Sequence, residues 1–309
     1  MSKPPFPKTL SEFQSWFATE DACVRYLAES RWPDGYGCPR CDHDEAYELR
    51  SRPIFKCKKC NYQVSVTAGT VLHGTRLSIH DWFSAAYLVA THTPGISAVQ
   101  LQRQLGLKRY ETAWGLLQKL RRAMVRPERD RIYGEVEVDE TYVGGVEVGR
   151  RAGRLRDSTK TMVVGAVEMR GQGSGRVRLS VVEDLSAASL VGFLEASVTP
   201  GSIIHTDGWG GYRPLASTSY DHRRRTQGRA TNAGTLFPRV HRVFSNLKTW
   251  LTGTHHGVGA QHLQHYLNEY VFRFNRRRTP MVAFQSLLGL TSQHEATTYN
   301  MLYDGESTG

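Results

Sequence analysis

The spacing of hydrophobic and polar positions divides the chain into helical and strand-forming stretches. Before about residue 75 it predicts one opening helix over "SEFQSWFATEDACVRYLAESRW" and a later alternating strand in "NYQVSVTAGT". From about residue 76 to 130 the spacing is helical. Ser78 is a suitable N-cap for "SIHDWFSAAYLVATH", and "GISAVQLQRQLGL" and "KRYETAWGLLQKLRRAM" predict two helices joined at Gly106. This pair resembles a helix-turn-helix, whose second helix enters the major groove.

After about residue 133 the hydrophobic positions alternate instead. "GEVEVDETYVGG", "KTMVVGAVEMR" and "GRVRLSVVEDLS" predict three strands, "AASLVGFLEASV" predicts a crossover helix, and "GSIIHTDGW" predicts a fourth strand. This order is typical of a mixed sheet in an α/β layer fold. "FPRVHRVFSNLKTWLTGTHHG" then predicts an amphipathic helix that packs on the sheet through an apolar stripe: Val240, Val243, Phe244, Leu247 and Leu251.

The patterns together predict a multidomain α+β protein. We expect an opening helix and metal-binding hairpin in residues 1–75, a helix-turn-helix-like segment in 76–130, a mixed-sheet domain in 131–290 and a tail in 291–309. The sequence has no apolar run near the ~18 residues that a membrane span needs. The N-terminus "MSKPPFPKTLSEFQSWF" also lacks the layout of a signal peptide. We therefore expect a cytoplasmic protein.

The charge of the chain favours a polyanionic partner. The net charge is +11, and the stretch from His222 to Asn268 contains no Asp or Glu. Such an acid-free basic block suits nucleic acid, although it can also be a solvated face. The basic residues that we expect to contact DNA lie in the helical pair, in a Gly-rich loop and near the last two helices: Arg103, Lys108, Arg109, Lys119, Arg150, Arg151, Arg154, Arg242, Arg276 and Arg277.

Four of the five cysteines predict a zinc site. "CPRC" supplies Cys38 and Cys41, and "CKKC" supplies Cys57 and Cys60 after 15 intervening residues. Two Cys-x2-Cys turns at this spacing are typical of a four-thiolate structural zinc site, whose ion supplies folding energy to a segment with little core. Disulfides and redox thiols are the alternatives, and a cytosolic setting argues against disulfides. Cys23 reads as an ordinary thiol on a helix face.

Two aspartates are the candidate centre of chemistry. Asp139 is expected to end the first strand of the mixed sheet, and Asp207 the fourth. If these strands are neighbours, the carboxylates lie together and need a cation between them, and Mg2+ is a hard ion that prefers such oxygens. Two such ions can activate a hydroxyl for phosphodiester chemistry. Strand-end aspartates also cap turns, so this pair alone is a weak signal.

The helix that follows offers further site residues. His241 and Lys248 are seven positions apart and point the same way, beside the apolar stripe. Asn246 points about 140° away from His241 at 100° per residue. Near the fourth strand, His205 is expected to be a buried hydrogen-bonded histidine. Trp209 and Tyr212 either stack on a DNA base or pack in the core.

The motifs in combination resemble a known family. The zinc-ribbon spacing, "VDETYVGG", "HTDGWGGY", "VHRVFSNLKTWLTGTHHGV" and "HLQHYLNEYVFRFNRR" are similar to the zinc-ribbon-bearing transposases of bacterial insertion sequences, from about Phe13 to Leu288. The resemblance implies a DDE-type, ribonuclease-H-like domain that cleaves and joins DNA with Mg2+. It maps the first two acids onto Asp139 and Asp207 and the motif lysine onto Lys248.

The third acid of the resembled motif is missing here. His241 stands where the family pattern has an acid, and the next acid is Glu269. Imidazole can still bind a divalent ion and tilts the preference toward Mn2+. We place His241 first as third ligand, with Asn246 second. Glu269 is expected to lie off the apolar stripe of its helix and to pair with Arg273, although it is also an alternative third ligand.

The sequence thus predicts a transposase. The zinc ribbon and the helical pair would recognise terminal inverted repeats, and the sheet domain would cleave and join strands, with target DNA as the second substrate. A homodimer or higher assembly is expected on two DNA ends, at the bacterial nucleoid. The alternatives are a domesticated transposase that only binds DNA and a nuclease that cuts without strand transfer.

Overall fold

The computed structural model describes residues 4–49, 53–126, 128–144, 160–225, 236–298 and 301–302, with the side chains of 292 and 293 excepted. The chain divides into two compact units, which are treated separately below. One unit comprises Met1–Arg126 with Arg276–Gly309, and the other comprises Pro127–Asn275. Within the described ranges, no helix is long and apolar enough to span a bilayer.

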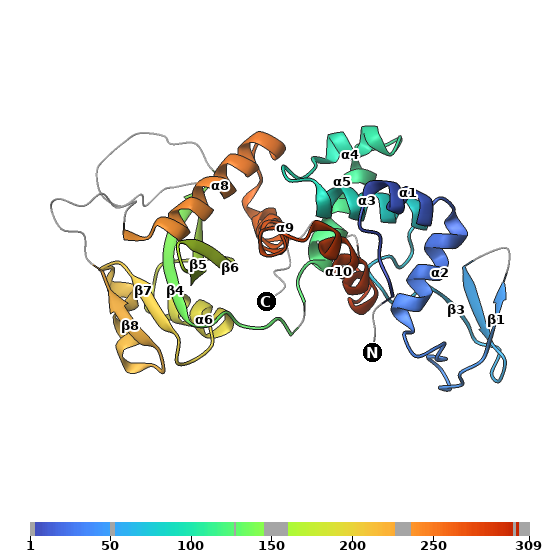
Figure 1. The fold of residues 1–309 in the computed structure, drawn as a ribbon, viewed down its shortest axis with the longest axis horizontal. Helices are drawn as coiled ribbons and strands as arrows, with labels where there is room; N and C mark the ends of the chain where they lie inside the picture. The colour runs from blue at the N-terminus through green and yellow to red at the C-terminus, as the bar shows by residue number, and fades with distance from the viewer. Residues whose placement is uncertain are drawn as a thin grey trace. The chain divides into compact units, whose positions relative to one another are not determined.

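The first unit is a helical assembly joined to a small sheet (Figure 1). Its helices are α1 (Leu10–Trp16), α2 (Glu20–Arg31), α3 (Ile79–Thr91), α4 (Ala98–Gln104), α5 (Tyr110–Ala123) and α10 (Pro280–Gln293). The single opening helix expected from the sequence is therefore two helices. Thr19 separates them, because it adopts an extended backbone and its hydroxyl accepts the N–H of Ala22 as the N-cap of α2. Ser78 caps α3 as predicted, accepting the N–H of Asp81.

Helix α10 belongs to this unit, whereas the sequence suggested that the mixed-sheet domain extends to residue 290. Phe284 of α10 lies among four aromatic rings from α1, α3 and the residue after α1, with centroids 5.4 to 6.4 Å away: Phe13, Phe17, Phe83 and Tyr87. Aromatic packing of this kind gains free energy from apolar burial and from edge-to-face geometry. The helix that follows the sheet domain in sequence thus completes the core of the N-terminal unit.

The small sheet of the first unit carries the cysteines. Strands β1 (Ala46–Leu49), β2 (Ile54–Cys57) and β3 (Gln63–Ser65) pair antiparallel in the order β1-β2-β3. The predicted strand "NYQVSVTAGT" is shortened to three residues, because its partner strand ends where Ile54 pairs with Ser65. The segment is small, and only Phe55, Cys57 and Val64 of its strand residues are buried, so its own core contributes little to its stability.

Helices α4 and α5 form the predicted helical pair. Gly106 lies between them with φ +62°, a left-handed conformation that glycine adopts without steric cost. Helix α5 is exposed only in its first turn, at Tyr110 and Glu111, and its later residues are buried or half-buried. Lys119, which we expected to contact DNA, is half-buried, and burial lowers its pKa. Any groove contact by this helix is therefore confined to its N-terminal end.

The second unit contains the predicted mixed sheet (Figure 1). Its five strands have the order β6-β5-β4-β7-β8. Strands β4, β5 and β6 are antiparallel neighbours, whereas β4, β7 and β8 run parallel. The strand bounds are β4 (Glu135–Val143), β5 (Thr161–Arg170), β6 (Gly173–Val182), β7 (Ile203–Thr206) and β8 (Asp221–Arg224).

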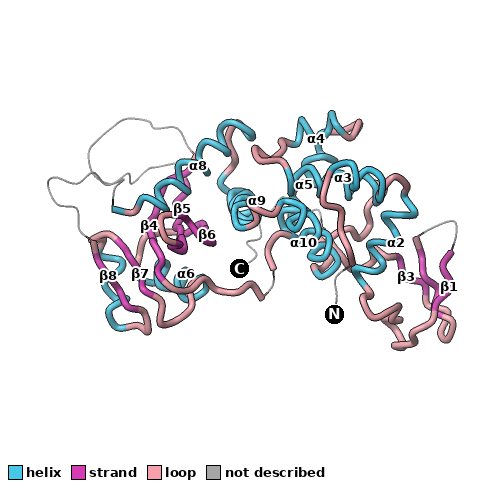
Figure 2. The backbone as a smooth tube through the Cα atoms, viewed as in Figure 1, coloured by secondary structure: helices cyan, strands magenta, loops and turns pink. Residues whose placement is uncertain are grey.

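Helices cover both faces of this sheet, as Figure 2 shows. One face packs under α8 (Pro238–His255) and α9 (Leu263–Asn275), which follows the short η2 (Ala260–His262). The opposite face packs on α6 (Ala187–Ser197) and the 3-10 helix η1 (Gly210–Ser217). The apolar stripe predicted for α8 is buried as expected: Val240, Val243, Phe244, Leu247 and Leu251. This two-layer burial fixes which side chains of each strand face α8.

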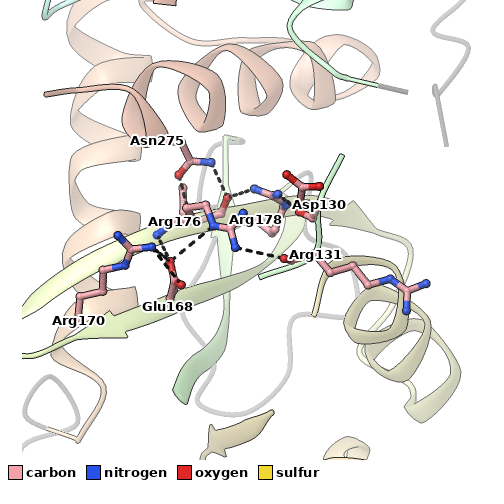
Figure 3. A network of polar contacts seen from close by, with 8 residues as sticks. Asp130, Arg131, Glu168, Arg170, Arg176, Arg178 and Asn275 are labelled. Atoms are coloured by element: carbon pink, nitrogen blue, oxygen red, sulfur yellow. Dashed lines mark hydrogen bonds and ion pairs between the residues drawn. The ribbon is translucent and has the colours of Figure 1, made fainter. Parts of the chain in front are cut away.

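The free edge of β6 is covered by side chains from α9. Asn275 accepts the N–H of Val177 at 2.8 Å and donates to its carbonyl at 3.1 Å, and Gln264 accepts the N–H of Val181 at 2.9 Å. Beside it, the buried carboxylate of Glu168 contacts Arg170 and Arg176 (Figure 3). Edge strands expose unpaired backbone groups, and these contacts satisfy two such N–H groups.

Candidate active site

The four predicted zinc ligands form one cluster. The ligand atoms of Cys38, Cys41, Cys57 and Cys60 all lie within 4.8 Å of one another. Two sulfur pairs are separated by 3.6 and 3.7 Å, close to the ~3.8 Å edge of a tetrahedron with Zn–S bonds of about 2.3 Å. Each Cys-x2-Cys turn thus aims two sulfurs at one point, as the spacing predicted.

The electrostatics of these thiols suit a bound cation. Burial raises the pKa of Cys38, but the backbone N–H groups of Arg40 and Cys41 outweigh it and bring that pKa to about 6. The His43 amide lowers the pKa of Cys41, but burial and the neighbouring thiols raise it to about 12. Without a bound cation, the Cys38 thiol therefore ionises readily, whereas the Cys41 thiol stays protonated. A divalent ion removes this difference because it stabilises all four thiolates.

Asp139 and Asp207 are carried by neighbouring parallel strands. The parallel register ends with Glu137 opposite His205, and two residues further along the chain from these lie Asp139 and Asp207. Side chains two residues apart share one face of a strand. Glu137 lies on the α8 face, since it contacts the start of α8. Asp139 therefore lies on the α8 face, and Asp207, the residue after β7, is near enough for its charge to raise the pKa of Asp139.

Asp139 does not end its strand, contrary to the sequence-based expectation. Strand β4 continues to Val143, because its antiparallel pairing with β5 runs from Val136 to Val143. Only its parallel pairing with β7 stops at Glu137. Asp207 does follow the last residue of β7 as predicted. The Asp139 carboxylate is thus anchored within a continuous strand, and its Oδ1 accepts the N–H of Glu140 at 2.9 Å.

His241 meets Asp139 from the helix above. His241 lies in the first turn of α8, and its Nε2 is 3.3 Å from Oδ2 of Asp139. Its side chain is 38 % exposed, against 17 % for Asp139. The structure therefore brings together one strand carboxylate and the imidazole that replaces the third acid of the motif.

Charge repulsion makes this site suitable for a cation. Burial raises the pKa of Asp139, and the nearby charge of Asp207 acts in the same direction. The hydrogen bond from Glu140 and the proximity of His241 oppose this rise. Two carboxylates and an imidazole are ligands that Mg2+ or Mn2+ accepts, and such an ion would relieve the repulsion. The residues present fit a divalent ion.

Glu140 is a half-buried acid on the opposite face of β4 that the sequence did not single out. Its Oε2 accepts the hydroxyl proton of Tyr212 at 2.7 Å. Burial raises the pKa of Glu140 to about 7, although the hydrogen bond from Tyr212 lowers it. Tyr212 is 1 % exposed and therefore packs in the core rather than offering its ring to a DNA base. This pair links the strand of Asp139 to the 3-10 helix that follows Asp207.

The turn after Asp207 explains the second glycine of the Gly-Gly pair in "DGWGGY". The N–H of Trp209 donates to Asp207 Oδ1 at 2.8 Å, and the Trp209 indole donates to the carbonyl of Leu185. A Cβ at Gly211 would lie 2.7 Å from that same carbonyl oxygen. Glycine is therefore needed for this close approach. The Asp207 carboxylate is thus held by the turn that follows β7.

The other candidate residues occupy different environments. Lys248 is exposed on α8, but partial desolvation of its ammonium group, together with the charge of Lys160, lowers its pKa. Asn246 is exposed, about 140° around the helix from His241 at 100° per residue. Glu269 pairs with Arg273 as predicted, Oε1 to Nη1 3.2 Å. It is nevertheless fully buried, so its expected position outside the packed side of α9 was wrong.

The predicted DNA-contacting residues differ in exposure. Arg103, Lys108, Arg109, Arg242 and Arg277 are exposed, and Arg276 is half-buried like Lys119. Arg150, Arg151 and Arg154 lie outside the described residues. Among the residues missed by sequence reasoning, Glu137 is prominent, because its buried carboxylate contacts the start of α8. Its alternation with Asp139 in "VEVDE" was the available signal.

The chain thus combines a small sheet that carries a four-cysteine cluster with a mixed sheet that carries acidic side chains on and beside its central strand, β4. This combination defines the class of two-part proteins with a zinc ribbon and an acid-bearing α/β domain. Family models match both parts: "ISXO2-like transposase domain" at residues 131–275 and "Transposase zinc-ribbon domain" at residues 18–63. The two matches together span more than half of the chain. The chain therefore belongs to the zinc-ribbon-bearing transposases of insertion sequences, and it is a transposase by family.

The individual proteins that resemble this chain share little sequence identity with it. A protein in transposable element ISH50 of Halobacterium salinarum is 26 % identical over 283 residues, which cover 85 % of this chain and 94 % of the relative. A chain of the simian T-cell lymphotropic virus intasome, solved with PP2A regulatory subunit B56 gamma, gives a TM-score of 0.32 at 15 % identity, covering 57 % of this chain and 67 % of that one. Mos1 transposase in its paired-end complex with the left transposon end gives a TM-score of 0.21 at 12 % sequence identity, covering 69 % of this chain and 81 % of that one.

Proposed function

We propose that this transposase binds the terminal inverted repeats of an insertion sequence and performs metal-dependent cleavage and strand transfer. Asp139, Asp207 and His241 hold the divalent ion, Mg2+ or Mn2+, and Lys248 contacts a DNA phosphate. The observation that supports this most strongly is the parallel pairing of β4 with β7, because Asp139 and Asp207 each follow the last residue of this pairing by two positions. The 3.3 Å contact of His241 Nε2 with Asp139 Oδ2 supports His241 as the third ligand.

The residues of the chain have separate tasks in this proposal. A bound divalent ion supplies charge neutralisation at the reacting phosphate and activation of the attacking hydroxyl. Asp139 and Asp207 orient the ion because both are fixed by backbone hydrogen bonds to their oxygens. Lys248 and its neighbour Lys160 form a cationic rim, and two nearby cations suit a polyanion backbone.

DNA-end recognition is assigned to the first unit. Exposed Arg103, Lys108 and Arg109 surround the turn of the helical pair, beside the exposed first turn of α5. Recognition helices contact base edges through their N-terminal residues. Two ends must be held for joining, so the active form is a homodimer or a larger assembly on DNA, at the nucleoid.

The test is a joining assay with labelled terminal-repeat DNA, a target plasmid and Mg2+ or Mn2+. We expect joined products from the native chain. Asp207→Ala should lower joining by on the order of 10³-fold or more, because a carboxylate that stabilises charge in the transition state is lost. End binding, measured by filter retention, should stay within about twofold, since the first unit is unchanged.

Asp221→Asn provides the matched control. Asp221 is an aspartate of the same sheet, but it is half exposed and paired with Arg223 on β8. We expect normal joining from it. Cut ends without joined products from the native chain would identify a nuclease, and binding alone would identify a domesticated DNA-binding protein. Normal joining by Asp207→Ala would remove Asp207 from the mechanism.

A further inference from the structure

We propose that Glu137 is a positioning residue that fixes the first turn of α8 and so holds His241 against Asp139. This inference rests on the proposed metal site. Glu137 is 1 % exposed, and it lies two residues before Asp139 on the same face of β4. A buried carboxylate is costly unless its oxygens are satisfied, so the identity of its partners shows what it stabilises.

The partners of Glu137 are the first groups of α8. Its Oε2 accepts the backbone N–H of Arg239 at 2.8 Å and that of Val240 at 3.0 Å. The first N–H groups of a helix have no acceptor within the helix. Phe237, at the N-cap position, supplies none with its side chain. A strand carboxylate thus acts as the cap, and its negative charge also suits the N-terminal end of the helix dipole.

The charge of Glu137 is balanced by the same helical turn. Oε1 is 2.7 Å from Nη1 of Arg239. The guanidinium extends further, donating from Nε to the carbonyl of Gly173 at 3.0 Å and from Nη2 to that of Gly171. Arg239 therefore ties the start of α8 to the turn between β5 and β6. The helix start is held by both β4 and that turn.

This anchoring bears directly on His241. The N–H of His241 donates to the carbonyl of Phe237 at 3.1 Å, closing the first turn of the helix. Glu137 holds residues 239 and 240, and Asp139 meets residue 241, so two alternate strand positions contact consecutive residues of one turn. Loss of the Glu137 contacts would free that turn and with it the ring of His241. Partners of this kind behind a metal ligand commonly affect metal affinity.

Glu168 distinguishes positioning from general stabilisation. It is also a buried glutamate of this sheet paired with arginines, as Figure 3 shows, and its Oε2 accepts the N–H of Arg176. It pairs in register with Val136, whose side chain faces the α6 layer. Glu168→Gln therefore removes a comparable buried charge on the face away from α8.

The experiment is a thermodynamic cycle on Mn2+ binding by the full chain with zinc retained, followed through the EPR signal of free Mn2+. Four proteins are compared: the native chain, Glu137→Gln, His241→Ala and the double variant. We expect Glu137→Gln to weaken Mn2+ binding on the order of tenfold. In the His241→Ala background, Glu137→Gln should weaken Mn2+ binding by less than about a further twofold, because its effect on the ion passes through His241. Glu168→Gln should keep native affinity.

Unchanged Mn2+ affinity in Glu137→Gln, or a full additional loss in the double variant, would overturn the proposal. Asp207→Asn is titrated in parallel. If that variant binds Mn2+ like the native chain, the proposed metal site is wrong, and Glu137 is then judged by hydrogen exchange alone. Faster exchange over the first turn of α8 in Glu137→Gln, but not in Glu168→Gln, supports the anchoring role, and equal exchange refutes it. If Glu137→Gln does not fold, Glu137→Asp, which is one methylene shorter, replaces it with the same criteria.

Discussion

The zinc ribbon and the sheet site gather their ligands in different ways. The ribbon takes four cysteines from 23 consecutive residues, and their sulfurs form a closed cluster. In the part of the chain that the structure describes, no other group of three or more His, Cys, Asp or Glu has ligand atoms all within 4.8 Å of one another. The proposed sheet site instead combines Asp139 from β4, Asp207 from the turn after β7 and His241 from α8, and it is more open.

This difference has a physical meaning. A closed four-thiolate site leaves no position for a substrate, and the ion adds folding energy. An open carboxylate site leaves room for phosphate oxygens and water around an ion. We therefore expect the ribbon to depend on its metal for structure and the sheet, which has a hydrophobic core on each face, to fold without one. Perturbations of metal, packing and hydrogen bonding should separate the two regions.

Zinc removal should have the largest effect and should be confined to the ribbon. Structural zinc sites contribute roughly 10 kcal/mol or more to folding. We expect Cys57→Ser to lose zinc and to abolish exchange protection in β1 to β3, while the peptides of β4, β5 and β7 keep theirs. Hydrogen exchange with zinc analysis of the same samples measures both.

Cys23→Ala is the matched control for that change. Cys23 is buried in α2 and belongs to no described thiol cluster, so this variant should keep one zinc per chain and a protected ribbon. Native protection of the ribbon in zinc-free Cys57→Ser would show that the segment folds by its own packing, and the contrast with the sheet would disappear.

A packing change should affect the sheet without touching any ligand. Gly165 pairs in register with Asp139, and a Cβ there would lie 2.7 Å from Phe244 of α8 and 2.9 Å from Leu179. We expect Gly165→Ala to lower the free energy of unfolding of this unit by about 1–3 kcal/mol, as overpacked cores do. Urea unfolding measures it. Gly192→Ala, where nothing lies within 4 Å of the new Cβ on α6, should not destabilise.

If Gly165→Ala were as stable as the native chain, α8 would not be held closely against β5 above Asp139. Such a result would weaken the role given to helix packing in placing His241. The ribbon should be unaffected in either case, so its zinc content serves as an internal reference.

Local patterns were sufficient to predict the ribbon. Cysteine spacing encodes a turn and a ligand pair within four residues, and no long-range information is needed. The apolar stripe of α8 and the alternating hydrophobic positions of β4 were also predicted correctly, because burial on one face of a helix or strand imposes a regular spacing on its hydrophobic residues. The adjacency of Asp139 and Asp207 was a conditional prediction, since strand order is not a local property.

The errors arose where partners are distant in sequence. Helix α10 was assigned to the sheet domain because it follows α9, yet Phe284 is buried among rings contributed by the N-terminal helices. Glu269 was expected outside the packed stripe, but its pairing with Arg273 satisfies the charge inside the core. In the sequence alone, Glu137 and Glu140 resemble the solvent-exposed polar residues of a strand. Only the helices on each face reveal that both are engaged by buried partners.

The smallest predicted effect concerns the tie between Glu140 and Tyr212, and it should depend on pH. Burial raises the pKa of Glu140 from 4.5 to about 7, so the folded state binds this proton more tightly than the unfolded state. Its stabilising contribution is therefore present below about pH 4.5 and is lost as pH rises through about 7. Tyr212→Phe removes the hydrogen bond that lowers this pKa, so the loss with rising pH should become larger.

We expect Tyr212→Phe to cost about 1 kcal/mol more at pH 8 than at pH 5, because hydrogen bonds to charged acceptors contribute more than those to neutral ones. Urea unfolding without Mg2+ or Mn2+ measures this difference. Tyr220→Phe is the control, since its hydroxyl donates to the carbonyls of Leu194 and Val198, which do not titrate. Its cost should be equal at both pH values. If Tyr212→Phe also cost the same free energy at pH 5 and pH 8, Glu140 would not change its charge in this range. The stability of the Glu140–Tyr212 contact would then not depend on pH.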